Sequence, residues 1–150
     1  MPGILNHSPA DIIRYLLIQM GAGVNPTVST SNWPIYVSSE PNLPDNCITI
    51  FDTLGEISNK NHLNGKVIEH NGFQIRVRAE NHPTGYVKAN SIAQLIDTEL
   101  YRESVTIDSS DYCIHSVKRV SDIIPLGTDS PTSKRYLFTI NFLVYLYLSL

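Results

Sequence analysis

The last fifteen residues of the chain, 136–150, alternate between two faces along their whole length. One face carries Tyr136, Phe138, Ile140, Phe142, Val144, Leu146, Leu148 and Leu150; the other carries Leu137, Thr139, Asn141, Leu143, Tyr145, Tyr147 and Ser149. Because successive side chains of a strand point to opposite sides of a sheet, this period of two predicts one long strand. The run is shorter than the roughly 18 to 20 residues of a membrane-spanning helix. Its last third is apolar on both faces, so we expect another element or another subunit to cover it.

A second alternating stretch, FQIRVRAENHPTGY, spans residues 73–86. Its odd-numbered positions are the apolar Phe73, Ile75, Val77 and Ala79, and its even-numbered positions are the polar Gln74, Arg76, Arg78 and Glu80. This alternation predicts a strand with one core face and one polar face. The Asn71-Gly72 pair before it is a strong hairpin signal, so we expect a tight turn there after a strand over Val67–His70.

Two segments switch to helical spacing. Ser8-Pro9-Ala10-Asp11 is a typical helix start, and Gly21 is a typical helix end, so a helix is predicted over about 9–20. Its apolar positions recur at helical spacing and are Ile12, Ile13, Leu16, Leu17 and Met20. A second helix is predicted from about Tyr86 to Glu103, with Thr84 as its cap; its apolar positions are Ala89, Ile92, Ala93, Ile96 and Leu100.

The remaining segments predict short strands and loops. Residues 21–45 form a Pro-rich linker with an edge strand at Trp33–Val37. Further strands are expected at 47–52, 104–108 and 112–120, with exposed loops at Gly55–Gly65 and Ile123–Pro131. The predicted elements follow in the order helix, strands, helix, strands, and the chain has 150 residues, which together predict a single α+β domain. In this domain the linker at 21–45 follows the first helix, and the sheet and the second helix occupy 46–150. We expect an antiparallel or mixed sheet with two helices packed on one face.

Composition narrows the classes of function. The net charge is -3 with no dense Lys/Arg block, which argues against sequence-specific nucleic-acid binding. Only 17% of residues are charged, and so few surface charges suggest contacts with partners. Cys47 and Cys113 form no CxxC pair and are expected as reduced thiols of a cytosolic setting, with one disulfide as the less favoured alternative. The first residues show no signal-peptide pattern, and no membrane segment is expected.

Residue patterns for chemistry are weak. The five histidines lack metal-ligand spacing, and no nucleophile elbow or phosphate-binding loop occurs, so we assign no catalytic, cofactor-binding or metal-binding residue. Cys113 and His115 share one face of a predicted strand but lack an orienting carboxylate. His82-Pro83 reads as the end of a strand before a helix.

Two groups of residues are candidates for a subunit interface. Arg76, Arg78 and Glu80 form a row on the polar strand face, and arginine is favoured in interfaces because it pairs bidentately with carboxylates. Such rows are more often solvated or paired with neighbouring strands. Tyr145 and Tyr147 lie opposite the core face of the last strand, where contact with a partner chain would explain them.

Several stretches together carry a family resemblance: PDNCITIFDT, GFQIRVRAENHPTGYVKANSI, YCIHSVKRVSDIIPLGTD and KRYLFTINF. In their order and spacing, over roughly Pro44–Phe142, they resemble the small phage proteins known as minor capsid, tail completion or tail terminator proteins. The long linker at 21–45 and the apolar C-terminus LVYLYLSL depart from that pattern.

The resemblance implies a structural virion protein of a tailed bacteriophage and no enzyme. Its subunits would form a ring, commonly a hexamer, that caps the tail tube and joins it to the neck. The implied partners are the tail tube protein and the neck or head-completion proteins. Assembly would take place in the host cytoplasm, and the loops at 55–65 and 123–134 would order on assembly. The alternatives are a small intracellular enzyme, or a peptide or nucleic-acid binding module using the Arg76 and Arg78 face.

Overall fold

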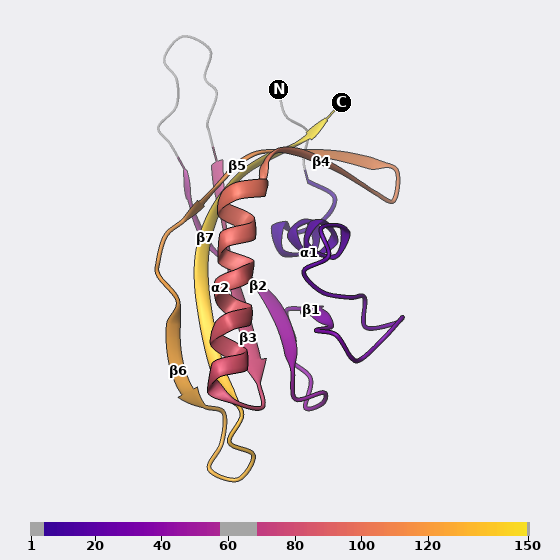
Figure 1. The fold of residues 1–150 in the computed structure, drawn as a ribbon. Coiled ribbons are helices and arrows are strands. Elements are labelled where there is room, and N and C mark those ends of the chain that lie inside the picture. Colours follow the sequence, from indigo (N-terminus) through magenta and orange to yellow (C-terminus); the bar gives the residue numbers. More distant parts are fainter. Residues whose placement is uncertain (1–4, 58–68, 150) are drawn as a thin grey trace.

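The computed structural model describes residues 5–57 and 69–149 (Figure 1). The elements in chain order are α1 (Pro9–Gln19), β1 (Ile35–Val37), β2 (Cys47–Ile57), β3 (Glu69–Ala79), α2 (His82–Glu99), β4 (Tyr101–Ile107), β5 (Ser110–Arg119), β6 (Ile124–Thr128) and β7 (Tyr136–Ser149). No helix in the described ranges is both long and apolar enough to span a membrane.

The strands form one sheet in the order β1-β2-β3-β7-β5-β4, and β6 pairs with β7 outside this path. β1 runs parallel to β2, and the other pairs are antiparallel. The long β7 lies in the middle, since β3 pairs with one of its edges and both β6 and β5 pair with the other. The predicted α+β class with a mixed sheet is confirmed.

Both helices pack on the same face of the sheet. That face carries the odd-numbered residues of β3 from Phe73 to Ala79, which are fully buried. It meets the buried stripe of α1 and the buried positions of α2. Phe73 and Phe142 stack in the middle of this layer with ring centroids 4.9 Å apart. The alternation read from the sequence therefore separates a covered face, toward the helices, from an open face.

The first helix has the predicted start and end. The Ser8 hydroxyl accepts a hydrogen bond from the Asp11 backbone N–H at 3.3 Å, which caps the helix. Gly21 follows the C-cap residue with φ +82°, a left-handed conformation that glycine adopts without steric cost.

The second helix starts earlier than predicted, and its cap is a different residue. Asn81 is the N-cap and accepts from the Thr84 backbone N–H at 2.9 Å, so the prediction of Thr84 as the cap was wrong. The helix ends at Glu99, and Tyr101–Glu103 already belong to β4. The physical reason is that β4 pairs with β5 from Tyr101 onward, which overrides the helical preference of these residues.

The predicted hairpin turn at Asn71-Gly72 was also wrong, because both residues lie inside the continuous strand β3. A Cβ atom at position 72 would lie 2.4 Å from the Leu54 carbonyl oxygen, where β2 has an irregularity between Thr53 and Glu56. The glycine is therefore needed for close approach of two strands, not for a turn. Gly55, Glu56 and Ile57 of the predicted loop belong to β2; residues 58–65 and the predicted strand start at 67–68 lie outside the described residues.

Two predictions in the last third had different outcomes. The strands predicted at 104–108 and 112–120 are present, but β4 already begins at Tyr101 and β5 at Ser110. They form a hairpin with a two-residue turn, Asp108 and Ser109, whose φ angles are 48° and 67°. The segment Ile123–Pro131 was expected to be a loop but contains β6. β6 forms because β7 is longer than its partner β5, so the first residues of β7 offer a free edge to it.

Candidate assembly surface

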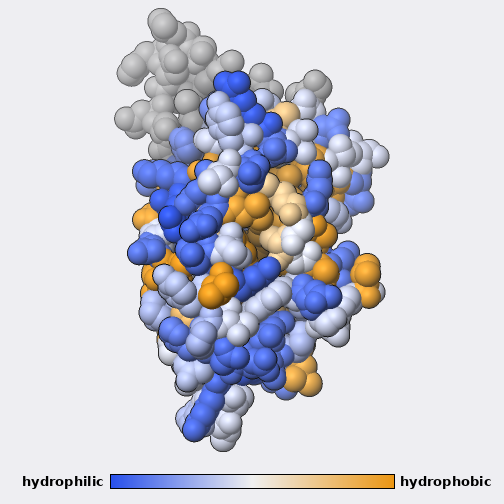
Figure 2. Space-filling model, viewed as in Figure 1, coloured by the Kyte–Doolittle hydropathy of each residue, from blue (hydrophilic) through white to orange (hydrophobic). Residues whose placement is uncertain are grey.

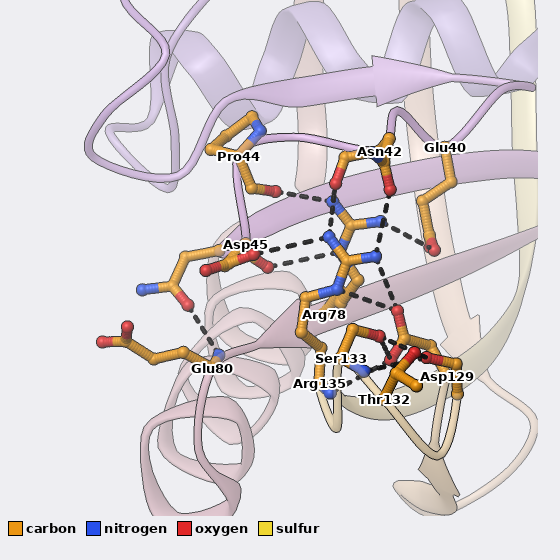
Figure 3. Close-up of polar contacts among 12 residues, drawn as sticks. Glu40, Asn42, Pro44, Asp45, Arg78, Glu80, Asp129, Thr132, Ser133 and Arg135 are labelled. Atoms are coloured by element: carbon orange, nitrogen blue, oxygen red, sulfur yellow. Dashed lines mark hydrogen bonds and ion pairs between the residues drawn. The ribbon is translucent and has the colours of Figure 1, made fainter.

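Polar residues gather at one end of the open face, around Arg78 of β3 (Figure 3). Arg78 is only 2% exposed, and a charged side chain is buried at low cost only when its donors are all used. Its Nη1 donates to Glu40 Oε1 at 3.2 Å, and its Nη2 donates to the carbonyl oxygens of Asn42 and Pro44 at 3.3 and 2.5 Å. Its Nε donates to the Asp45 carbonyl at 3.3 Å. One guanidinium thus holds the whole segment 40–45.

A second guanidinium, that of Arg135, lies beside the first and is 9% exposed (Figure 3). It forms ion pairs with Asp129 Oδ2 at 2.7 Å and with Asp45 Oδ1 at 3.4 Å. It also donates to the Asn42 carbonyl oxygen, which Arg78 contacts as well. The two arginines are therefore joined through one backbone carbonyl, and Arg135 links the segment 40–45 to the turn before β7.

The turn 129–135 is organised around the Asp129 carboxylate. Burial by itself raises the pKa of this carboxyl, but hydrogen bonds from Ser133 and Arg135 and the charge of Arg135 outweigh burial and lower the pKa to about 2. The Ser133 hydroxyl donates at 2.8 Å and the Arg135 backbone N–H at 3.0 Å. The carboxylate is consequently ionised over the whole physiological pH range.

We call this group the arginine clamp: Arg78, Arg135, Glu40, Asn42, Asp45 and Asp129. Two cations face three carboxylates, and a third cation, Arg76, lies 3.8 Å from Glu40 Oε2. The opposite charges balance, as the burial of the guanidinium groups requires. The clamp fixes two loops at the same end of the sheet, the β1–β2 connection and the β6–β7 turn, and so gives that end a defined shape.

Aromatic side chains gather at the other end of the open face, around Tyr145 of β7. Its ring lies 5.3 Å from the His115 ring, 5.7 Å from the His70 ring and 6.2 Å from the Tyr147 ring, measured between centroids. We call these four residues the tyrosine cluster. Both tyrosines are half-buried, so part of each ring reaches solvent. The neighbouring Cys113, through its charge and a hydrogen bond, raises the pKa of Tyr147.

The five predicted interface residues therefore fall into two separate places. Arg76 and Arg78 both pair with Glu40 at the clamp, whereas Tyr145 and Tyr147 lie at the far end of β7. Glu80 is exposed just beyond β3, and its backbone N–H donates to Asn46 Oδ1 at 2.9 Å. Their role in an interface stays a prediction, and the burial of Arg78 leaves that side chain almost no surface to present.

The residues considered for catalysis are not brought together as an active site. Cys113 and His115 are separated by an irregularity of β5, and the His115 ring packs edge-on against Tyr145. His82, in the first turn of α2, packs against the rings of Tyr136 and Phe138. Cys47 is fully buried, and burial raises the pKa of its thiol to about 11, so the reactive thiolate is scarce at neutral pH. Both cysteines are free.

Within residues 5–57 and 69–149, no group of three or more His, Cys, Asp or Glu side chains is placed to hold a metal ion.

Sequence reasoning missed most of the clamp. In the sequence Glu40, Asn42 and Asp45 belong to the predicted linker 21–45, and no pattern marks Arg135. The one available signal was local: Asp129-Ser130-Pro131-Thr132-Ser133 has the composition of a turn closed by side-chain hydrogen bonds. The partners of Arg78 are 33 to 38 positions away in the sequence, and no local pattern identifies them.

Comparison with known proteins supplies the family. A family described as "Bacteriophage tail terminator protein" matches residues 16–147, which is most of the chain. No curated protein matches. One similar solved chain has a TM-score of 0.45 and 12% identity, over 94% of this chain and 99% of the other, a likeness too distant to bear on function. The match to the family extends from α1 to β7, and the chain belongs to the bacteriophage tail terminator protein family.

Proposed function

We propose that this protein is a structural subunit of a bacteriophage virion that assembles into a ring, most simply a hexamer, at the end of the tail tube. The ring caps the tube and joins it to the neck, so its partners are the tail tube protein and the neck or head-completion proteins. The chain acts as a single domain without enzymatic activity, and it enters the virion after assembly in the host cytoplasm. The observation that carries the proposal is the family match over residues 16–147.

The geometry of the open face supports this role. A ring subunit needs surfaces of fixed shape, because it meets identical neighbours and two different structures above and below. The arginine clamp provides one fixed end, where the loops at 40–45 and 129–135 are held by buried guanidinium groups. Arg76 and Glu80, at or next to this end, are the proposed contacts there, while Arg78 shapes the surface from inside.

The tyrosine cluster supports a second contact surface on the same face. Tyrosine is enriched in interfaces because it offers a large apolar area together with a polar hydroxyl. Tyr145 and Tyr147 are half-buried in the isolated chain, and a neighbouring subunit would cover the rest of their rings. We therefore propose Tyr145 and Tyr147 as interface residues of the ring.

The alternative functions have less support. A thiol enzyme needs a base within hydrogen-bond reach of the nucleophile, and the His115 ring packs on Tyr145 instead. A peptide or nucleic-acid module on the Arg76 and Arg78 face needs free guanidinium groups, and Arg78 uses its donors within the chain.

Native mass spectrometry of the purified full-length protein tests the proposal. We expect a closed oligomer of one defined copy number, and co-purification with the tail tube protein from infected cells. A strict monomer at micromolar concentration that also fails to bind isolated tails would contradict the proposed function. If that monomer bound an added oligonucleotide, the result would support the alternative function as a nucleic-acid binding module.

A further inference from the structure

The outer edge of β4 is open. β4 is the last strand in the sheet order, and within the described residues no backbone group outside β5 pairs with it. At the other end of the sheet, the edge of β1 is covered, because Val24 forms a bridge with Pro34 and accepts a hydrogen bond from the Ile35 N–H at 3.0 Å. The fold therefore protects one end of the sheet and leaves the other end unpaired.

The hairpin geometry identifies the unpaired groups. The left-handed two-residue turn at Asp108 and Ser109 is the type that closes on a hydrogen-bonded pair, here Ile107 and Ser110. Hydrogen-bonded and non-hydrogen-bonded pairs alternate along an antiparallel ladder, so the N–H and C=O groups of Thr106 and then Ser104 point outward. Four strong backbone donors and acceptors thus lie side by side on a free edge.

Features that usually block such an edge are missing from the second half of β4, although the charged Arg102 and Glu103 precede it. Natural edge strands carry proline, bulges or charged residues that prevent pairing with another chain. The segment Ser104–Ile107 has none of these and is rich in β-branched residues, which favour strand pairing. An edge of this kind is a site for strand addition.

A different strand offers a complementary surface. β6 is exposed along its whole length, and no charged residue lies between Ile123 and Thr128. Ile124 and Leu126, together with the nearby Val120, are three of the large apolar side chains exposed on this protein. In Figure 1 β6 lies at the left margin and the β4–β5 hairpin at the upper right, and Figure 2 shows hydrophobic side chains along the left margin.

We propose that β4 of one copy lies along the outer edge of β6 of the next copy and continues the sheet across the subunit boundary. The contact is head-to-tail, because the two strands are different and lie on different sides of the molecule, and repetition of such a contact closes a ring. The outward N–H groups of Ser104 and Thr106 donate to carbonyl oxygens of β6. β6 carries Pro125, which lacks an N–H, and its pairing with β7 is irregular between Pro125 and Gly127. Both features limit pairing along β6, so the contact is short, β6 acts as the acceptor, and its apolar side chains become buried. This inference rests on the proposed ring.

Disulfide trapping tests the contact in the assembled full-length protein. Cys113→Ser removes the half-buried thiol, and the buried Cys47 is kept. In this background the double variant Ser104→Cys, Leu126→Cys should give, under mild oxidation, a ladder of covalent species beyond the dimer. Each single variant should give none, and a mixture of the two single variants should stop at the dimer. The matched control is Val28→Cys with Leu126→Cys, since Val28 is exposed but lies in the linker; this pair should give no ladder.

Amide hydrogen exchange of the same samples gives an independent measurement. The amides of Ser104 and Thr106 should exchange freely in the monomer and become protected in the oligomer. The amides of Val105 and Ile107, which face β5, should be protected in both states.

The outcomes separate this inference from the proposed function. A ring without the ladder and without protection at Ser104 and Thr106 would overturn the β4–β6 contact and leave the ring intact. Covalent dimers from Ser104→Cys alone would also overturn it, since they would show pairing of β4 with itself. A strict monomer by native mass spectrometry would overturn both.

Discussion

Arg78 shows how little the type of a residue says about its role in this protein. It sits on the polar face of a strand, beside Arg76, and both positions look alike in the sequence. In the folded chain Arg78 is almost fully buried and Arg76 is about half-buried, because the segment 40–45 crosses the sheet over Arg78. The difference arises from a distant segment and not from the strand itself.

The first prediction concerns this buried guanidinium. Arg78→Ala should lower the free energy of unfolding by about 3 to 5 kcal/mol, because Glu40 and three carbonyl oxygens lose their donor in a buried place. Arg119→Ala is the matched control; its ion pair with Asp97 at 2.9 Å is about one-third exposed and contributes about 1 kcal/mol or less. Urea unfolding followed by circular dichroism measures both. Equal losses in the two variants would show that the clamp does not hold the loop.

The second prediction concerns the pH dependence of the Asp129–Arg135 pair. The folded pKa of Asp129, about 2, lies below the value of about 3.9 expected in the unfolded chain. A carboxyl with a lowered folded pKa stabilises the protein above its unfolded pKa, and this contribution is lost as the pH falls toward the folded pKa. Asp129→Asn should therefore cost a constant amount of stability between pH 7 and 5, and a decreasing amount below about pH 4.

Thermal unfolding of both proteins from pH 7 to pH 3 measures this difference. A cost that does not change over the whole range would mean that the Asp129 charge contributes nothing, and that only the shape of the side chain matters. Ser133→Ala removes one of the hydrogen bonds that lower this pKa and leaves the Arg135 ion pair in place, so it should show a smaller cost with the same direction of pH dependence.

At the scale of elements, close packing decides several features that propensity alone would not. Gly85 lies in the first turns of α2, where glycine is unfavourable by about 1 kcal/mol relative to alanine. A Cβ atom there would lie 2.6 Å from the Phe138 ring and 3.0 Å from the Ala79 Cβ. The glycine allows α2 to approach β7 and β3 closely enough to bury the core between them.

The third prediction follows from this contact. Gly85→Ala should destabilise the protein by about 1 to 3 kcal/mol, opposite in sign to the effect of helix propensity, because the fully buried Phe138 ring has no space to move. Gln94→Ala, on the exposed side of the same helix, should be nearly neutral. In the Gly85→Ala background, Phe138→Leu should cost less than in the wild type. Stabilisation by Gly85→Ala would show that the helix can move away from the sheet.

At the scale of the whole molecule, one face of the sheet builds the core and the other presents surfaces. The helices cover the first face, and their own outer surface is largely polar, with apolar side chains visible in a hollow between α1 and α2 (Figure 2). The open face has the arginine clamp at one end and the tyrosine cluster at the other. The ring proposed above would use such a division, because folding and assembly would then depend on different residues.

The fourth prediction separates assembly from folding. Tyr145→Ala with Tyr147→Ala should weaken oligomerisation by about tenfold or more, since truncating an aromatic interface residue costs more than about 1 kcal/mol when it is central to a contact. The melting temperature of the monomer should change little more than in the control pair, Tyr15→Ala with Tyr86→Ala, whose rings are exposed on the helices. Analytical ultracentrifugation over a concentration series measures the association. Unchanged association would remove both tyrosines from the interface.

By itself, the sequence determined the elements whose signal is local. The period of two in 136–149 and 73–79 fixed two central strands and their buried faces, and the Ser8 cap with Gly21 fixed the first helix. These patterns suffice because alternation and capping depend only on near neighbours in the chain. The family resemblance, confirmed by the match over residues 16–147, likewise came from local motifs in order.

Only the tertiary structure decided what the polar residues do. In the folded chain Asn71-Gly72 lies where two strands approach closely and does not form a turn. Ile124–Thr128 pairs with the free edge of β7, and Arg135 lies against Asp45, 90 positions away in the sequence. The reason is physical: a buried charge or an open strand edge takes whichever partner the folded chain brings within reach. The alternation along a strand predicts which face of the sheet a side chain lies on. The residues that pack against that face come from distant parts of the sequence, so the alternation does not identify them.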